Sequence, residues 1–242
     1  MTAADGIRAR NRIAIEAAIL RVGRDHLARY GAAALSLRAV ARDLGMASSA
    51  VYRYVEGRDE LLTRLIVSAY DSLADAVDAD LADLPVGAAP AQAFRAIATA
   101  TRRWATAHPH EYALIYGSPV PDYDAPADRT TPAGTRVTTR LMQVLPPLTD
   151  PRLDTARDAR ALGTGPADLP TGSGLSAGSL RRGMTAWNLV LGTITAELFE
   201  QYGPDTLRDP DAFFDAVLDD ALTIVQGAPP QPHRPASTST RL

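Results

Sequence analysis

The heptapeptide SSAVYRY at residues 48–54 gathers hydroxyl, phenol and guanidinium groups that suit contacts with nucleic acid. Short hydroxyls allow a close approach to a DNA groove, a guanidinium can donate two hydrogen bonds to guanine, and tyrosines can reach phosphates or thymine methyl groups. The side chains that a short helix would expose here are Ser48, Ser49, Tyr52, Arg53 and Tyr54. Their chemistry predicts recognition of double-stranded DNA, and the alternative is a helical hairpin with an ordinary solvated face.

The residues before this heptapeptide predict a helix and a tight turn that would hold it in place. Ser36 is suited to cap a helix, and Gly45 can adopt the left-handed conformation that ends one. The apolar face of that helix would consist of Leu37, Val40, Ala41 and Leu44. After the turn a second helix would begin and bury Ala50 or Val51 against the first. This spacing is typical of a helix-turn-helix.

The distribution of charge agrees with a nucleic-acid contact near the N-terminus. Residues 1–60 hold ten arginines against seven carboxylates, whereas the remaining residues hold fifteen arginines against twenty-one carboxylates. The sequence contains no lysine. A basic end on an acidic body is typical of a polyanion-binding part joined to a part with a second function.

The composition excludes several classes of site. The 242 residues include no cysteine, so disulfides, thiolate nucleophiles and cysteine-ligated metals are excluded. No run of eighteen apolar residues occurs, and the N-terminal residues lack the apolar stretch of a signal peptide. We therefore expect a cytoplasmic protein that does not contact a membrane.

The histidines of the sequence HPHE at residues 108–111 are poorly spaced for metal binding. His108 and His110 lie two residues apart, so they would point to different sides of a helix, and no third ligand is nearby. The sequence also lacks the GxSxG, HExxH and dinucleotide-binding motifs. We expect no catalytic residue, no metal and no cofactor, and we expect that the protein is not an enzyme.

Apolar periodicity predicts an all-α fold. The helices expected after the helix-turn-helix cover residues 58–82, 90–108, 109–116, 131–145, 178–202 and 211–226. A first helix covers 13–30 with an apolar face of Ile13, Ala17, Leu20 and Leu27. Residues 146–178 and 227–242 are rich in Gly, Pro or small polar residues and predict no packed element. We expect a DNA-binding domain at 1–57, a larger ligand-binding and dimerisation domain at 58–226, and a disordered tail at 227–242.

The last two expected helices carry more apolar surface than one partner can cover. One stripe of the first helix consists of Leu189, Gly192, Ala196 and Phe199, and the second helix presents Phe214, Val217, Leu218, Ala221, Leu222 and Val225. A helix that is apolar on two sides needs two partners. These residues predict a four-helix interface in a homodimer, and the alternative is a larger core within one chain.

Several large side chains could line a cavity for a small molecule. The candidates are Trp104, Tyr112, Tyr116, Met184 and Trp187. Because they are aromatic or aliphatic, the expected ligand is apolar or amphipathic. Each of them is equally suited to a core without a cavity.

Residues 12–66 resemble the TetR-type bacterial transcription regulators. The resemblance rests on HLARYG, LSLRAVARDLG, AVYRYV and GRDELL. It implies a dimer that binds a palindromic operator, and a C-terminal part that binds a small molecule and thereby releases the DNA. It also implies that Arg38 reaches DNA from the second helix and that Arg58 holds a phosphate at the start of the fourth. The implied recognition helix consists of Ser48, Ser49, Ala50, Tyr52, Arg53 and Tyr54.

The C-terminal part resembles the subgroup whose regulatory domain is named for a Trp-His-Gly signature. The segments HPHEYALIYGSPVPDY and AWNLVLGTITAELFEQYGP carry this resemblance, but Leu191 stands where histidine would precede Gly192. The function expected from all these features is a ligand-released, TetR-like repressor of an operator. The alternative is a small-molecule-binding or catalytic helical protein whose N-terminal hairpin mediates protein contacts.

Overall fold

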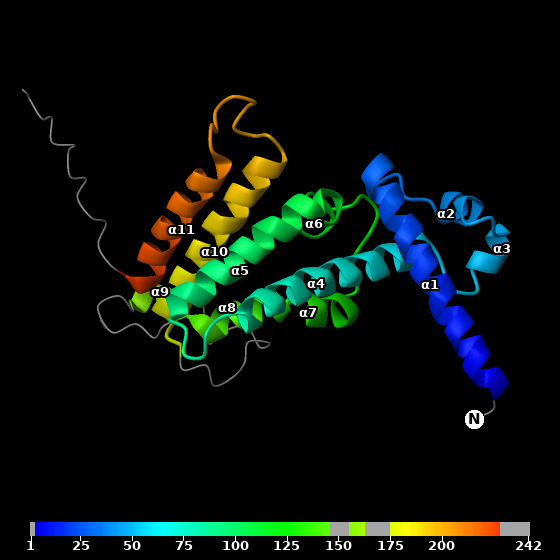
Figure 1. Cartoon of the computed structure of the whole chain (residues 1–242), viewed down its shortest axis with the longest axis horizontal. Coiled ribbons are helices and arrows are strands. Elements are labelled where there is room, and N and C mark those ends of the chain that lie inside the picture. The colour runs from blue at the N-terminus through cyan, green and yellow to red at the C-terminus, as the bar shows by residue number, and fades with distance from the viewer. Residues whose placement is uncertain (1–2, 146–154, 163–174, 228–242) are drawn as a thin grey trace, which may run out of the picture. The chain divides into compact units, whose positions relative to one another are not determined.

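The computed structural model describes residues 3–145, 155–162 and 175–227, and every regular element in these ranges is an α-helix (Figure 1). The all-α prediction is confirmed. Within the described residues no helix is both long and apolar enough to cross a membrane. Most of the predicted tail at 227–242 lies outside the described residues, since only Gly227 belongs to them.

The chain divides into two compact units. The first comprises residues 1–88 and 95–141, and the second comprises residues 89–94 and 142–242. Helix α5 (Pro90–Ala107) therefore begins in the second unit and continues in the first. Helices beyond residue 57 pack against the N-terminal ones in this division, and the domain boundary expected after residue 57 stays a prediction.

The first helix, α1 (Ala3–Tyr30), is longer than expected and buries only part of the predicted apolar face. Ile13 is 65% exposed and Ala17 is also exposed, so both are wrong as predicted members of the apolar face. The predicted residues Leu20 and Leu27 do pack in the core, together with Ile19 and Val22. Apolar residues lie on more than one side of this helix, and contacts with other helices determine which side is buried.

The turn between α2 (Leu37–Asp43) and α3 (Ser48–Val51) has the predicted geometry. The Ala39 amide donates to Ser36 Oγ over 3.5 Å, so Ser36 caps α2. Gly45 has φ +67°, its amide donates to the Arg42 carbonyl over 3.0 Å, and the Met46 amide donates to the Ala41 carbonyl over 2.9 Å. This pair of hydrogen bonds is a Schellman motif, which satisfies carbonyls at the end of α2.

Arginines of neighbouring helices form ion pairs with carboxylates of helix α4 (Arg58–Ala82). On α7 (Ala127–Gly134), Arg129 donates to both oxygens of Glu60, and on α8 (Arg136–Val144), Arg136 lies 2.7–3.1 Å from three aspartates of α4. Those aspartates are Asp71, Asp75 and Asp78. The single helix predicted at 131–145 is wrong, because α7 and α8 are separate helices that meet three residues after Pro132, which has no amide N–H to donate.

The second unit contains α9 (Ala156–Leu162), α10 (Ala177–Leu198) and α11 (Pro210–Gln226). The first of these lies in the segment where no packed element was expected, and Arg181 of α10 anchors it by donating to Asp158 over 2.5 Å. Residues 146–154 and 163–174 of that segment lie outside the described residues. Figure 1 shows α10 and α11 side by side, as their contacts require.

We predict that Gly45→Ala lowers the free energy of unfolding by about 1–2 kcal/mol, because a side chain is disfavoured in the left-handed conformation. Urea unfolding followed by circular dichroism measures this difference. Gly6→Ala is the control, since Gly6 lies within α1 and has no positive φ. Equal stability of Gly45→Ala and wild type would show that the turn does not need the left-handed residue.

We predict that Glu60→Gln makes the stability of the protein less dependent on pH. The hydrogen bonds from Arg129, and then those from Arg64, hold the pKa of Glu60 below its ordinary value of about 4.3. A carboxyl with a lowered folded-state pKa contributes stability above the unfolded value, and this contribution is lost as pH falls through the folded-state pKa. The variant should therefore unfold more easily at pH 7 and match wild type in stronger acid.

Chemical unfolding at pH 7, 5, 4 and 3 tests this expectation. Glu56→Gln makes the same chemical change on an exposed side chain, so its difference from wild type should depend less on pH. A stability difference for Glu60→Gln that persists unchanged at the lowest pH would contradict the assignment.

Candidate nucleic-acid interface

The segment predicted to contact DNA is exposed on one side and anchored on the other. Val51 is 0% exposed and Val55 is 1% exposed, and both belong to the core of the N-terminal helices. The exposed predicted residues are Arg38, Ser48, Ser49, Tyr52 and Arg53, and the half-buried ones are Ala50, Tyr54 and Arg58. A buried aliphatic anchor beneath exposed hydrogen-bonding groups is the arrangement that a helix-turn-helix uses to present side chains to DNA.

The recognition segment is less helical than expected. Only residues 48–51 form α3. In the turn that continues to Tyr54, the Arg53 amide donates to the Ala50 carbonyl and the Tyr54 amide donates to the Val51 carbonyl. These are hydrogen bonds between residues three apart, as in a 3₁₀ turn. Tyr52 and Arg53 therefore project from a turn that follows the helix.

Arg12 supports this segment from α1, and the sequence analysis did not identify it. Its guanidinium carbon lies 5.7 Å from the centroid of the Tyr54 ring, and its Nε donates to Glu16 over 3.0 Å. Such a cation–π contact is worth about 0.5–1 kcal/mol at an exposed site. The excess of arginine near the N-terminus was the available signal, but it could not indicate the tyrosine partner.

Arg58 is already engaged with the protein. Its Nη2 donates to the Ala33 carbonyl over 3.4 Å, and its Nη1 lies 3.3 Å from an oxygen of Asp59. The cavity of about 380 Å³ beside it is also lined by the carboxylates of Glu56, Asp59, Glu60 and Asp124. These contacts tie the start of α4 to the loop after α1, and nearby negative charge weakens the attraction of a phosphate. The phosphate contact of Arg58 stays a prediction.

A second tie joins α1 to α2. His26 is 3% exposed, and its Nε2 lies 2.7 Å from an oxygen of Asp43. The hydrogen bond with His26 and the neighbouring guanidinium of Arg42 hold the pKa of Asp43 below its ordinary value. Sequence reasoning missed this pair because the two residues are seventeen positions apart and match no motif.

Three of the predicted ligand-contacting residues lie in the first unit, where Tyr112 and Tyr116 pack against each other and Trp104 packs against His108. Trp104 Nε1 donates to Ser72 Oγ over 3.0 Å, and the rings of Tyr112 and Tyr116 have centroids 5.1 Å apart. Burial raises the pKa of Tyr116, and the nearby Tyr70 and Tyr112 add to this effect. The other two predicted residues, Met184 and Trp187, belong to the second unit.

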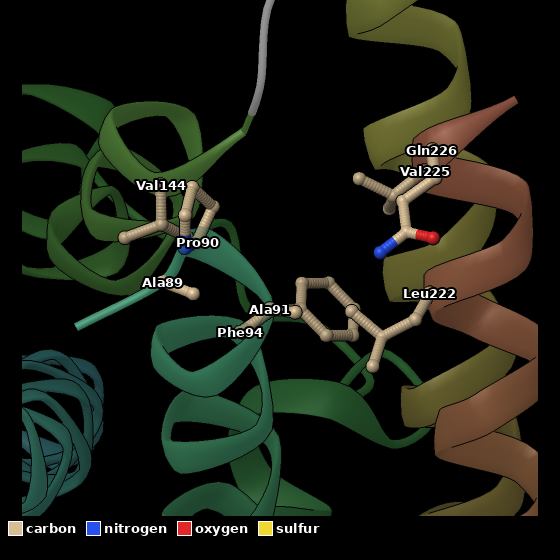
Figure 2. Close-up of a pocket in the computed structure, with 8 residues that line it drawn as sticks. All are labelled: Ala89, Pro90, Ala91, Phe94, Val144, Leu222, Val225 and Gln226. Carbon is tan, nitrogen blue, oxygen red and sulfur yellow. The ribbon is translucent and has the colours of Figure 1, made fainter.

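A cavity in the second unit involves none of the five predicted ligand-contacting residues. Its volume is about 250 Å³, and it is lined by Ala89, Pro90, Ala91, Phe94, Val144, Leu222, Val225 and Gln226. Figure 2 shows the Phe94 ring and the Leu222 side chain facing each other, with the amide of Gln226 above them. The walls are therefore mainly apolar with one amide. The lining residues are far apart in sequence, so no local pattern identified them.

The predicted dimer residues fall into two groups. Leu189 (36% exposed), Gly192 and Phe199 (42% exposed) are exposed, whereas Ala196 is 8% exposed. The α11 residues Phe214, Val217, Leu218, Ala221, Leu222 and Val225 are all at most 9% exposed. Their apolar surface is covered within one chain, so it is not available to a partner without rearrangement. This corrects the assignment of the whole α11 stripe to the interface.

The histidines near Pro109 make a protein contact. His108 Nδ1 lies 3.2 Å from an oxygen of Glu111. In the part of the chain that the structure describes, no group of three or more His, Asp or Glu residues is arranged to hold a metal ion.

The fold and the exposed segment on its valine anchor define a helix-turn-helix transcription regulator. The family described as "Bacterial regulatory proteins, tetR family" matches residues 19–65, and "Tetracyclin repressor-like, C-terminal domain" matches residues 94–221. The chain belongs to the TetR family, which confirms the resemblance inferred from the sequence motifs. Members of this family are transcription regulators and not enzymes.

Similar proteins support the same class. The chain is 44% identical over 207 residues to HTH-type transcriptional regulator Mb1846 of Mycobacterium bovis and to HTH-type transcriptional regulator Rv1816 of Mycobacterium tuberculosis, covering 84% of this chain and 88% of each relative. The crystal structure of the regulatory protein SCO4313 is similar with a TM-score of 0.72 and 33% identity, over 88% of this chain and 98% of that one.

We predict that Arg53→Ala weakens binding to the preferred operator by about 1–3 kcal/mol per half-site and reduces the preference at one base pair. The reason is that an exposed guanidinium on the recognition segment can donate to both O6 and N7 of guanine. Fluorescence anisotropy on the operator, its single-base variants and random duplex measures both effects. Arg140→Ala is the control, because it removes the same charge from a residue that pairs with Asp78. Unchanged base preference would mean that Arg53 contacts only phosphate.

Proposed function

We propose that the protein is a homodimeric repressor that binds a palindromic operator in the cytoplasm and is released by a small apolar or amphipathic molecule. The observation that carries this proposal is the exposed segment from Ser48 to Arg53, held by buried Val51 and Val55 after a Schellman turn. Membership of the TetR family supports it, since dimers, operators and effectors are typical of that family.

The exposed apolar residues of α10 and α11 support the dimer. Leu189 and Phe199 of α10 and Phe213 of α11 each expose between 36% and 42% of their surface in the single chain. No Cβ placed on Gly192 would meet an atom within 4 Å, so a partner helix could approach closely there. Large apolar side chains exposed on the same pair of helices are typical of a surface that a second copy covers.

The cavity between α11 and the start of α5 supports the effector. Its volume of about 250 Å³ is slightly below the range of roughly 300–1,000 Å³ that is common for ligand sites. Phe94, Leu222 and Val225 offer an apolar surface, and the amide of Gln226 offers one donor and one acceptor group. A molecule with an apolar body and a single polar group fits these walls.

Selection of bound sequences from random duplex DNA tests the proposed function directly. The expected product is an inverted repeat whose half-sites are about one helical turn, or roughly 34 Å, apart, unless the operator takes two dimers. Binding should weaken steeply with added salt, because phosphate contacts release counterions. Failure to enrich any sequence, or enrichment of a site without dyad symmetry, would contradict the proposal.

We predict that Leu189→Glu converts the dimer to a monomer and weakens operator binding at least tenfold, which corresponds to about 1.4 kcal/mol. A carboxylate at the centre of an apolar interface would lose its hydration without a partner. Light scattering gives the mass, and anisotropy gives the affinity. Val86→Glu is the control, because Val86 is a fully exposed apolar residue in the loop after α4. If the Leu189→Glu variant is still a dimer, Leu189 does not lie in the dimer interface.

A further inference from the structure

The contacts of Glu111 join three helices of the first unit. Glu111 lies in α6 (Pro109–Tyr116), and its carboxylate is only 14% exposed. One oxygen lies 3.2 Å from Nδ1 of His108, at the junction with α5, and the other lies 3.2 Å from Nε of Arg24 on α1. Arg24 in turn donates from Nη2 to Ser68 Oγ on α4 over 2.8 Å. One largely buried carboxylate therefore connects α6 to α1, and through Arg24 to α4.

Each end of this chain of contacts reaches a group with an expected role. At one end the His108 ring lies 5.3 Å from the ring of Trp104, one of the predicted ligand-contacting residues. At the other end Arg24 is two residues before His26, which holds Asp43 on α2. The contacts thus run from Trp104 to α1, which holds α2 through the contact between His26 and Asp43.

A pair of this kind keeps its helices together. Separating the carboxylate of Glu111 from the guanidinium of Arg24 would leave this largely buried charge without its arginine partner, which is more costly than losing an exposed ion pair. A shift of α6 therefore tends to carry α1 with it. The hydrophobic core, which includes Ile19 and Val22 of α1 and against which Leu114 of α6 packs, also holds the two helices together, and the ion pair adds a directional contact.

We infer that Glu111 and Arg24 are positioning residues that link the surroundings of Trp104 to operator binding by α2 and α3. This inference rests on the proposed function, because it concerns the operator binding proposed there. Neither residue touches DNA in this proposal. Their role is to make the position of α1 depend on the position of α6.

Linkage is reciprocal, so the link can be measured without knowing the effector. If a change near Trp104 alters operator affinity, operator binding must alter the surroundings of Trp104. The chain has two tryptophans, so Trp187→Phe leaves Trp104 as the single indole. In this background, addition of the operator obtained by selection should change the Trp104 emission, and random duplex at equal occupancy should change it less.

The decisive variants are Glu111→Gln, Arg24→Gln and the double variant, all in the Trp187→Phe background. Each single substitution should abolish the Trp104 response to operator and weaken operator binding by between 5-fold and 150-fold, the range typical of coupling between sites. The double variant should lose little more than either single variant, because both break the same contact. Arg24 is 39% exposed and Glu111 only 14%, so Arg24→Gln tests the link with less effect on folding than Glu111→Gln.

Asp80→Asn is the matched control. Arg103 of α5 donates to both oxygens of Asp80 on α4, over 3.0 and 2.6 Å, so this pair also joins two helices of the first unit but does not involve α1. The control should keep the Trp104 response and the operator affinity, and circular dichroism should show the same helix content in all variants.

The outcomes separate the inference from the proposed function. If wild type enriches no operator, the proposed function fails and the inference fails with it. If wild type binds an operator but Trp104 does not respond, or if both single variants behave like Asp80→Asn, the inference alone is overturned. Strictly additive losses in the double variant would also overturn it, because two independent contacts would then be involved.

Discussion

The acidic side of α4 is the constraint on which the first unit depends. Arginines from other helices bind it along its whole length: Arg129 binds Glu60 near the start, Arg136 binds three aspartates in the middle, and Arg103 binds Asp80 near the end. Exposed pairs of this kind contribute only about 0–1 kcal/mol each. Their main effect is to specify the angle and position at which α5, α7 and α8 meet α4.

The apolar side of α4 supplies most of the stability. Leu61, Leu65, Leu73 and Val77 are all at most 1% exposed, and burial of such a side chain contributes about 1.5–3 kcal/mol. The two sides of α4 therefore have different roles. The leucines and the valine stabilise the helix in the core, and the carboxylates determine the positions of the neighbouring helices. Because the chain has no lysine, every such contact uses a planar guanidinium, which can donate two parallel hydrogen bonds to one carboxylate.

Local features were predictable from the sequence, and features set by distant contacts were not. Ser36 and Gly45 were identified because a cap and a left-handed residue act on the next few amides. The buried phase of α1, the separation of α7 from α8, and the existence of α9 depend on partners elsewhere in the chain. The same holds at the candidate site: Ser48, Ser49 and Arg53 follow from residue type, whereas the Arg12 contact and the cavity at Phe94 require the folded chain.

The brevity of α3 affects how selectively the protein can recognise DNA. A single helical turn followed by bonds between residues three apart has little main-chain cooperativity, because helix formation gains strength only as more turns are added. Side chains on such a segment can adapt to grooves of slightly different width. The segment then loses conformational entropy when it becomes ordered on binding. For the operator binding that we propose, we therefore expect few base pairs to carry the sequence preference and related sites to be tolerated as secondary targets.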